Sequence, residues 1–288
     1  MKKILLMILS SNQELYQATS DVLLKGYKMW LEKIPMDIDI IRCTAGEKTE
    51  RIGDTLYMDC DDHDLYTKGR IIMEYIMDHP EYDVVINTNA CTLVNLVFIN
   101  RFVNSDSFNS SQHIHQFFGH SILTVTGGTW AFLNGTFLMC TRDFFIKHIC
   151  DFEKYDKYNS EIEKELQNYE WFRDRYNDKH IWNGVGNDTT WGKMVYDEYI
   201  DFAVLPSITT RNWPNATLCK DTFNINLSPI YDQHFDIPYD DRLIVEPTTM
   251  GLAFMCMINH MMTDEEYNYI VDDISYYNKQ MSTNEINQ

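Results

Sequence analysis

The apolar run Tyr82-Asp83-Val84-Val85-Ile86 is followed directly by Asn87-Thr88-Asn89-Ala90-Cys91-Thr92-Leu93-Val94-Asn95. A short run rich in β-branched residues is typical of a strand that is buried on both faces of a parallel sheet. The small polar residues after Ile86 predict that the strand ends there, with short side chains and backbone groups exposed. Because open α/β sheets bind ligands at the carboxyl ends of their strands, this stretch predicts one wall of a ligand site.

Strands and helices alternate from the N-terminus up to this stretch. Ile4 to Leu9 is an apolar run that ends at the turn-prone Ser10-Ser11-Asn12, and residues 13–31 carry apolar side chains at helical spacing. The remaining elements predicted before residue 82 are strands at 38–42 and 55–58 and a helix at 68–77. This alternation predicts the α/β class, with a mainly parallel central sheet flanked by helices.

The pattern is less regular in the second half of the chain. Ala131 to Cys140 is interrupted by Asn134-Gly135, which predicts two strands around a turn. We further expect a helix at 142–150, a charged helix or helical pair at 151–179, a last strand at 204–206, mostly loop at 207–250 and a capped helix from Thr263 to about Lys279. Residues 1–206 would form the region that holds the ligand site, and residues 207–288 a loop-rich and helical C-terminal extension of the same domain.

Composition narrows the class of protein. The chain has 288 residues, 44% of them hydrophobic, and a net charge of -19. A chain of this length forms one large domain or two small ones with a full core. The negative charge repels phosphate backbones and anionic membranes, so nucleic acid is not the expected partner.

Cysteine usage indicates the compartment. The seven cysteines are odd in number and widely spaced, and no two form a C-x-x-C pair: they are Cys43, Cys60, Cys91, Cys140, Cys150, Cys219 and Cys256. This pattern favours free thiols in a reducing environment, so we expect a cytoplasmic protein. Met1-Lys2-Lys3 before an apolar run mimics a signal peptide, but the run is short and lacks a cleavage site. Residues 251–262 are too few for the ~20 that a membrane span needs, so no anchor is expected.

Four segments, in order, resemble motifs of the GT-A glycosyltransferases, in particular the β-1,3-galactosyltransferase and fringe-like branch with its bacterial and viral relatives. Asp64-Leu65-Tyr66-Thr67-Lys68 is similar to the family's N-L-T-L-K before a helix, and Thr88 to Asn95 to its T-D-D-D-x-x-V-N. Asn134 to Asp143 is similar to S-G-x-G-Y-x-x-S-R-D, and Gly186 to Gly192 to E-D-V-x-x-G. The resemblance, over residues 64 to 192, implies a Rossmann-like GT-A fold.

The resemblance also implies an activity. A sugar would pass from a nucleotide-sugar, expected to be a UDP-sugar, to a hydroxyl of a saccharide acceptor, with inversion. Asp188 stands at the position of the catalytic carboxylate and would act as general base. Asn187 and Trp191 would bind the acceptor. The residues expected at the donor are Ser10, Ser11, Lys68, Thr88, Asn89, Cys91 and Arg211.

The chain departs from the family at its metal motif. The family's D-D-D aligns with Asn89-Ala90-Cys91, which contains no carboxylate. Because Mn²⁺ and Mg²⁺ prefer oxygen ligands, mainly carboxylates and phosphates, we assign no metal ligand, and a divalent cation stays an open possibility. Lys68, Arg211 or Lys220 would then neutralise the leaving group.

Several of these residues also have structural interpretations. Asn89 is a good turn former, Asp188 a good helix N-cap, and Lys68 would be an exposed lysine in a first helical turn. The acidic run 59–64 is either a solvated loop or a cation site. A loop is expected at His113, His115 and His120 in place of a metal half-site, and a buried thiol at Cys91 in place of a nucleophile.

Two further functions stay open. The missing acids at residues 89–91 and at Asn187 are compatible with a noncatalytic GT-A-like binding or scaffold protein. The second is a transferase that modifies bases in nucleic acid, which the net charge of -19 disfavours. The sequence does not indicate an oligomeric state.

Overall fold

The computed structural model describes residues 1–33, 36–90, 93–94, 96–105, 108, 117–119, 122–124, 130–133, 135, 137–168, 185–200, 202–204 and 209–210. The first half contains β1 (Ile4–Leu9), α1 (Glu14–Lys33), β2 (Ile38–Gly46), β3 (Glu50–Ile52), β4 (Thr55–Asp59), α2 (Leu65–Asp78) and β5 (Val84–Asn89). The elements that follow are β6 (Leu93–Val94), α3 (Leu96–Val103), β7 (Phe117–Gly119), β8 (Ile122–Thr124), β9 (Ala131–Leu133), β10 (Phe137–Thr141), α5 (Arg142–His148), α6 (Phe152–Leu166), α8 (Asn187–Tyr196), β11 (Phe202–Val204) and β12 (Thr209–Thr210).

Eight of these strands form one mixed sheet in the order β11-β7-β10-β5-β1-β2-β4-β3. β1 pairs in parallel with both β2 and β5, β2 with β4, and β7 with β11. β10 is antiparallel to β5 and β7, and β3 is antiparallel to β4. The predicted α/β class with a mainly parallel sheet is therefore confirmed, with β3 and β10 as its reversed strands.

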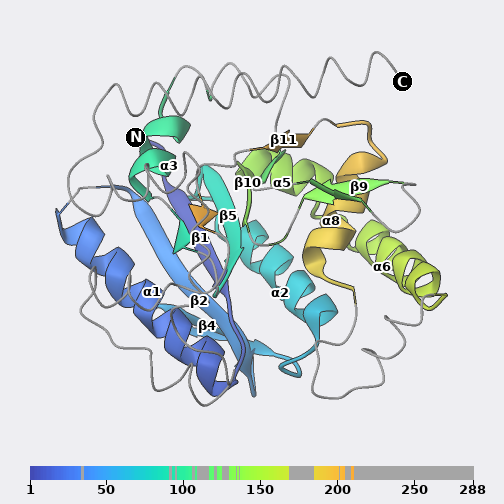
Figure 1. Ribbon diagram of the computed structural model, residues 1–288, viewed down its shortest axis with the longest axis horizontal. Helices are drawn as coiled ribbons and strands as arrows, with labels where there is room; N and C mark the ends of the chain where they lie inside the picture. The colour runs from blue at the N-terminus through green and yellow to red at the C-terminus, as the bar shows by residue number, and fades with distance from the viewer. Residues whose placement is uncertain are drawn as a thin grey trace, which may run out of the picture.

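The direction in which successive strands are added to the sheet reverses at β1. From β1 the chain steps outward to β2 and β4, and it then returns to β5 on the other side of β1. Because parallel crossovers are right-handed, these opposite steps place α1 and α2 on opposite faces, as Figure 1 shows. The carboxyl ends of β1 and β5 thus flank a topological switch point, where open α/β sheets bind their ligands.

The core lies on both faces of β1. Ile4, Leu5, Leu6 and Ile8 have no exposed surface, and each such side chain contributes about 1.5–3 kcal/mol through its burial. α2 packs on one face through a broad buried surface made by Ile71, Ile72, Met73, Tyr75 and Ile76. α5 and α8 extend this core cluster with Phe144, Phe145, Trp191 and Met194.

Most predicted elements of the first half are confirmed, but the predicted end of strand β5 is wrong. The strand runs from Val84 to Asn89 and does not stop at Ile86. Its ladder continues because Met7 pairs with Asn87, Leu9 with Asn89, and Phe137 of β10 with Thr88. The polar residues therefore form the last part of a central strand.

The second half also differs in detail. The two strands around residues 134–135 are present as β9 and β10, but they pair with β8 and β5 instead of with each other. β11 ends at Val204, and β12 lies in the stretch that we expected to be loop, because Thr209 and Thr210 pair with β6.

The helix expected from Thr263 lies outside the described residues. Among the described helices, none has the length and apolar character to cross a membrane.

Candidate functional site at the carboxyl edge of the sheet

The loop after β1 and the end of β5 meet at the switch point. The amide of Ala90 donates to the carbonyl of Leu9 at 2.9 Å, and the amide of Ser10 donates to the carbonyl of Cys43 at 2.8 Å. Ser10, Ser11 and Thr88 are buried, and Asn89 is half-buried. The structure thus brings together four of the predicted donor residues, Ser10, Ser11, Thr88 and Asn89. Their role toward a donor stays a prediction.

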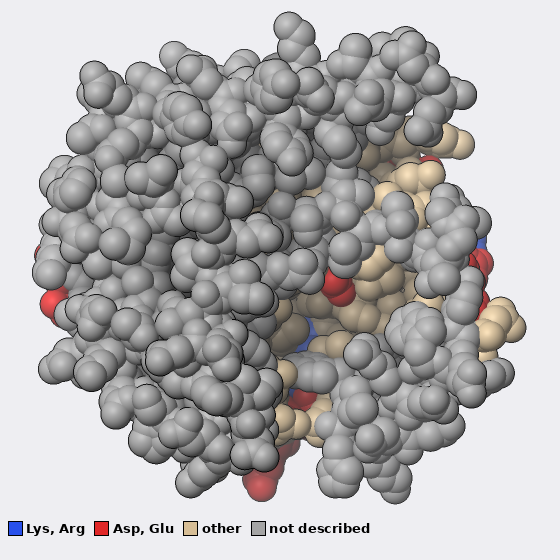
Figure 2. All heavy atoms as spheres, in the orientation of Figure 1, with Lys and Arg blue, Asp and Glu red and all other residues tan. Residues whose placement is uncertain are grey.

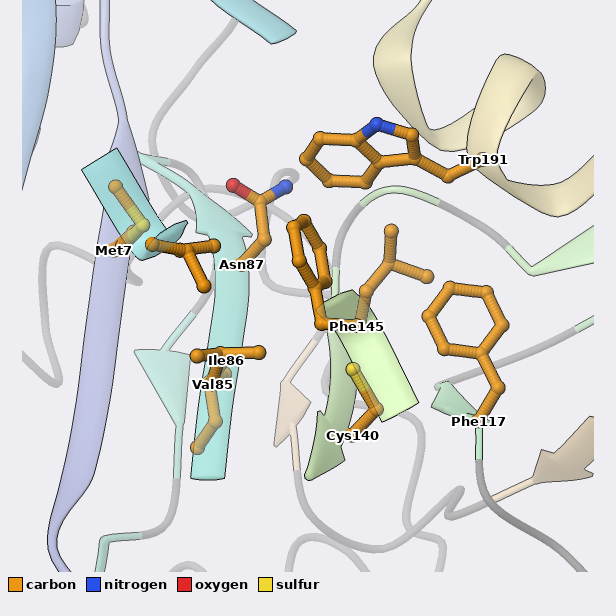
Figure 3. A pocket seen from close by; sticks show the side chains of 10 residues that line it. Met7, Val85, Ile86, Asn87, Phe117, Cys140, Phe145 and Trp191 are labelled. Atoms are coloured by element: carbon orange, nitrogen blue, oxygen red, sulfur yellow. The ribbon is translucent and has the colours of Figure 1, made fainter. Parts of the chain in front are cut away.

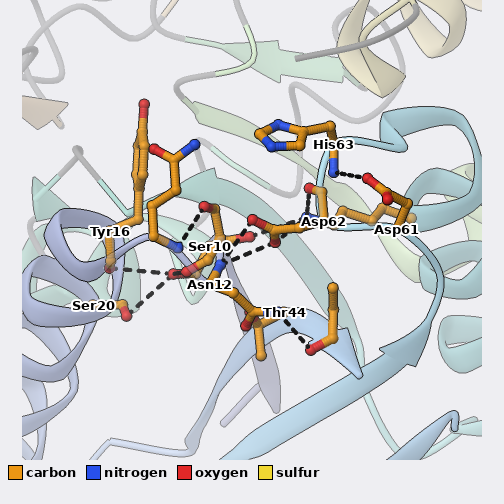
Figure 4. Close-up of polar contacts among 12 residues, drawn as sticks. Ser10, Asn12, Tyr16, Ser20, Thr44, Asp61, Asp62 and His63 are labelled. Carbon is orange, nitrogen blue, oxygen red and sulfur yellow. Dashed lines mark hydrogen bonds and ion pairs between the residues drawn. The ribbon is translucent and has the colours of Figure 1, made fainter. Parts of the chain in front are cut away.

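Side-chain hydrogen bonds order the loop after β1 (Figure 4). The Ser10 hydroxyl oxygen lies 3.2 Å from both the Ser20 hydroxyl and the Tyr16 carbonyl and can donate its one proton to either. The Thr44 hydroxyl donates to Asn12 Oδ1 at 3.1 Å. The backbone N–H of Asn12 donates to both carboxylate oxygens of Asp62 at 3.0 Å. Asn12, Thr44 and Asp62 were not predicted as site residues, although Asn12 stood in the predicted turn after the first strand.

Lys68 lies beneath this loop with its side chain fully buried. Its ammonium donates to the Ser10 carbonyl at 3.3 Å, to the Asp62 carbonyl, and to Asp62 Oδ1 at 3.2 Å. An ammonium has three donors, so protein acceptors can use all of them. The interpretation of Lys68 as an exposed lysine is wrong. In this arrangement Lys68 joins the β1 loop to the loop before α2, and its role toward a donor stays a prediction.

The acidic run before α2 is an ordered, hydrogen-bonded loop. Asp64 caps α2 by accepting from the amide of Thr67 at 2.9 Å and from its hydroxyl at 2.6 Å. Asp61 accepts from the amide of His63 at 2.9 Å. Asp61, Asp62 and Asp64 thus all have hydrogen-bond partners within the protein.

The described side chains at this edge do not fit the divalent cation of the family that the sequence resembles. Within the described part of the chain, no group of three or more His, Cys, Asp or Glu side chains could hold a metal ion. Asn89 and Ala90, at the family's metal motif, carry no carboxylate, and Ala90 is fully buried. We therefore derive no step through a metal.

Asp188 reaches the same edge from the first turn of α8. β10 runs against its neighbours, so its first residue, Phe137, pairs with Thr88 near the end of β5. The amide of Gly135, just before β10, donates to Asp188 Oδ2 at 2.9 Å, and the Thr189 hydroxyl donates to Oδ1 at 3.4 Å. Burial raises the pKa of Asp188 above its usual value, and these hydrogen bonds only partly oppose it.

This contact requires a glycine at position 135. A Cβ atom on Gly135 would lie 2.6 Å from Asp188 Oδ2, 2.7 Å from Cγ and 2.8 Å from Cβ. All three distances are below those of real Cβ contacts, so a side chain would push the carboxylate away. Gly135 and Asp188 therefore form a tight clamp between the start of β10 and the start of α8.

Asn187 and Trp191, the predicted acceptor residues, lie on one face of α8 and are buried to 4% and 1% exposure. The Trp191 ring meets Phe145 edge-on, with ring centroids 5.3 Å apart, in the main core cluster. A Cβ on Gly69 of α2 would lie 3.0 Å from the Asn187 Cβ. In this structure both side chains face the protein interior, and an acceptor role stays a prediction.

The remaining predicted site residues, Cys91 and Arg211, lie outside the described residues, as do Lys220 and the three histidines His113, His115 and His120. On the face of the molecule shown in Figure 2, the described side chains that come into view are mostly uncharged, with acidic groups among them and little basic surface. The described part of this face therefore does not present a cationic patch.

The comparisons with known proteins identify neighbours by fold only. No protein-family model and no curated protein matches the sequence. Among solved structures, the chain is similar to galactosyltransferase LgtC in complex with donor and acceptor sugar analogs, with 11% identity and a TM-score of 0.40 over 92% of this chain and 99% of that one. An active-site mutant of LgtC aligns with 10% identity and a TM-score of 0.33, over 53% of this chain and 62% of that one.

Proposed function

We propose that this protein is a glycosyltransferase that takes a sugar from a nucleotide-sugar donor, expected to be a UDP-sugar, to a hydroxyl of a saccharide acceptor. One observation carries the proposal. The switch point between β1 and β5 gathers the β1 loop, the polar end of β5 and the clamped Asp188 at one edge of the sheet. The four motif resemblances, in order along the same segments, support it.

In the proposed reaction the acceptor oxygen forms a bond to the anomeric carbon as the bond from that carbon to the donor phosphate breaks. Asp188 takes the proton of the acceptor hydroxyl, and a raised pKa makes it a stronger base. The polar β1 loop binds the nucleotide, and the charge of the leaving diphosphate falls to Arg211 and Lys220. Lys68 contributes by holding the Ser10 loop in place.

A noncatalytic binding protein of the same fold is the second candidate. The observation that favours it is that both carboxylate oxygens of Asp188 and the ammonium of Lys68 already have protein partners. Such a protein would bind a nucleotide-sugar at the same edge without consuming it.

Compartment and acceptor class belong to the proposal as well. Four described cysteines, Cys43, Cys60, Cys140 and Cys150, are free thiols. Burial raises the pKa of Cys43 and of Cys150 to about 12, so both stay protonated and unreactive at neutral pH. We place the protein in the reducing cytoplasm. The net charge of -19 supports a saccharide acceptor over nucleic acid.

A donor panel tests the function. The full chain is incubated with UDP-, GDP- and other nucleotide-sugars and a mixed saccharide acceptor set, with and without Mn²⁺, and nucleotide release is measured. We expect release from one donor class, and Asp188→Asn should lower kcat by roughly 10²–10⁴-fold because the general base is lost. Asp143→Asn, in the exposed first turn of α5, is the matched control and should keep full activity.

The outcomes separate the two candidates. Release of nucleotide that survives Asp188→Asn unchanged would reject the base assignment alone. Stabilisation of the protein by a nucleotide-sugar without any release would favour the noncatalytic binder. Neither binding nor release from any donor would reject the glycosyltransferase proposal.

A further inference from the structure

A second glycine, Gly186, lies against the other carboxylate oxygen of Asp188. Gly186 is the N-cap residue of α8, two positions before Asp188, and it makes no side-chain cap. A Cβ atom on Gly186 would lie 2.3 Å from Asp188 Oδ1 and 3.5 Å from Cγ. Because these distances differ by about 1.2 Å, the length of a carbon–oxygen bond, the Cγ–Oδ1 bond points almost directly at that Cβ position. Oδ1 therefore uses space that only a glycine leaves free.

The two glycines enclose the carboxylate from different directions. A Cβ atom on Gly135 would lie within 2.8 Å of Asp188 Oδ2, Cγ and Cβ, whereas one on Gly186 would meet Oδ1 end-on. The backbone N–H of Gly135 also fixes Oδ2 by its hydrogen bond of 2.9 Å. We call the space between Gly135 and Gly186 the glycine slot. A carboxylate that turned out of the slot would lose this hydrogen bond.

The start of α8 has little freedom to move away from the slot. The amides of Thr189 and Thr190 both donate to the carbonyl of Gly186, at 3.1 and 3.2 Å. Further along the helix, Trp191 is buried in the core and lies beside Phe145 of α5 (Figure 3). A side chain at residue 186 would therefore displace the carboxylate more easily than it would displace the helix.

We propose that Gly186 is a positioning residue, which leaves the space that holds the Asp188 carboxylate in one orientation for taking the proton of the acceptor hydroxyl. The inference rests on the proposed function, in which Asp188 is the general base. A base must lie within hydrogen-bond reach of the proton that it removes, so the orientation of its oxygens decides whether the proton can pass. Asp188, Gly135 and Gly186 are all half-buried, so the slot is not sealed from solvent.

A double-mutant cycle on the full chain tests the slot without any substrate. Gly186→Ala should lower the midpoint of urea denaturation, and the loss should be smaller in an Asp188→Ala background, where the carboxylate is absent. If Gly186→Ala alone does not fold, the double variant should fold. Gly192→Ala is the matched control on the same helix, because its added methyl would lie 2.3 Å from Phe132 Cβ. Its loss should be the same in both backgrounds. Equal losses for Gly186→Ala in both backgrounds would overturn the slot.

Kinetics test the positioning role. Nucleotide release is measured from the UDP- and GDP-sugars of the donor panel with the mixed saccharide acceptors. Folded Gly186→Ala should lower kcat by roughly 10²-fold, as for other misplaced catalytic groups, with the KM for the donor unchanged. The acidic limb of the kcat profile should also move to higher pH, because the displaced carboxylate loses the Gly135 hydrogen bond, which lowers its pKa.

The outcomes separate this inference from the proposed function. An unchanged kcat and pH profile in folded Gly186→Ala would overturn the positioning role while the wild type stays an active transferase. Wild-type protein that releases no nucleotide from any donor would reject the proposed function instead, and the positioning role with it. In that case the double-mutant cycle still decides whether the glycine slot constrains Asp188.

Discussion

At the scale of single residues, the clamp between Gly135 and Asp188 is one of the tightly constrained contacts at the site. The carboxylate occupies the space that a side chain at residue 135 would need. The site is therefore sensitive to a change as small as one methyl group, even though Gly135 itself carries no reactive atom.

We expect Gly135→Ala to lower the free energy of unfolding by about 1–3 kcal/mol, because the added methyl overpacks against Asp188. Urea denaturation of the two proteins measures the difference. Gly53→Asn is the control: Gly53 has a φ of +58°, a Cβ added there would meet no atom within 4 Å, and asparagine tolerates this conformation. Equal stability of Gly135→Ala and the wild type would show that the clamp is looser than described.

A second residue-scale prediction concerns pH and the Asp39–Arg51 pair. The Arg51 guanidinium donates to both oxygens of Asp39 at 2.9 Å, and the Tyr82 hydroxyl also donates to Asp39. Burial acts to raise the pKa of Asp39, but these hydrogen bonds and the Arg51 charge outweigh it and hold the pKa below its usual value. A depressed carboxyl pKa stabilises the fold above the unfolded-state pKa, and this stability is lost as the pH falls through the folded-state pKa.

Asp39→Asn should therefore cost about 2 kcal/mol near pH 7, and the difference from wild type should shrink below about pH 4. Chemical denaturation at a series of pH values measures it. Glu50→Gln, which breaks the exposed pair with Lys48, is the control and should cost at most about 1 kcal/mol at any pH. A cost for Asp39→Asn that did not change with pH would refute the electrostatic explanation.

At the scale of elements, the structure shows which helices and strands can be predicted from the sequence. β1 is a continuous apolar run, and α1 and α2 carry apolar residues at helical spacing, so the sequence predicts their positions to within about three residues. β3, with Glu50-Arg51-Ile52, has no such pattern and exists because it pairs with β4 at the sheet edge. β7 is only three residues long, Phe117 to Gly119, and depends on β10 and β11 for its partners.

The positions of the residues at the candidate site could be predicted only in part. The positions of Ser10, Ser11 and Asn89 at the edge of the sheet could be predicted because they stand at strand ends, which is local information. The burial of Lys68 and the role of Asp62 depend on contacts with residues 10 and 12, which lie 50 to 58 positions away in the chain. No local pattern reports such contacts, so the sequence left two interpretations of Lys68 open, a donor-binding residue and an exposed lysine.

The contacts of Lys68 with the β1 loop and with the loop before α2 lead to a prediction at the scale of elements. Lys68→Met would leave the Asp62 carboxylate and the Ser10 carbonyl without their buried partner. We expect a loss of about 3–5 kcal/mol in the free energy of unfolding, as for other buried pairs that lose one member. Lys28→Met, which removes an exposed ion pair with Asp54, is the matched control and should cost about 0–1 kcal/mol. Similar costs for the two variants would show that Lys68 does not join the loops.

At the scale of the whole molecule, the dominant property is a net charge of -19 on 288 residues. Charges of one sign repel each other more strongly in the compact state than in the unfolded chain. Salt weakens this repulsion, since the Debye length falls from about 30 Å at 0.01 M to about 8 Å at 0.15 M.

The Tm at pH 7 should therefore rise when NaCl is increased over this range, as differential scanning calorimetry can measure. Close to the isoelectric point of about 4.7 the net charge is small, so the same addition of salt should have much less effect. A Tm that is independent of salt at pH 7 would mean that local ion pairs compensate for the net charge.

The reversed direction of β10 has a consequence for how the chain folds. β1, β2, β4 and β5 all lie within the first 89 residues, so this half of the sheet can pair while the rest of the chain is still being synthesised. The contact from Gly135 to Asp188 spans 53 residues and needs β10 to be already in place against β5. Both residues of this contact are synthesised after β5, so they become available later than the strands of the first half. We therefore expect the clamp to be among the last contacts to form, so a ribosome-bound chain can hold an ordered β1–β5 sheet before its site exists.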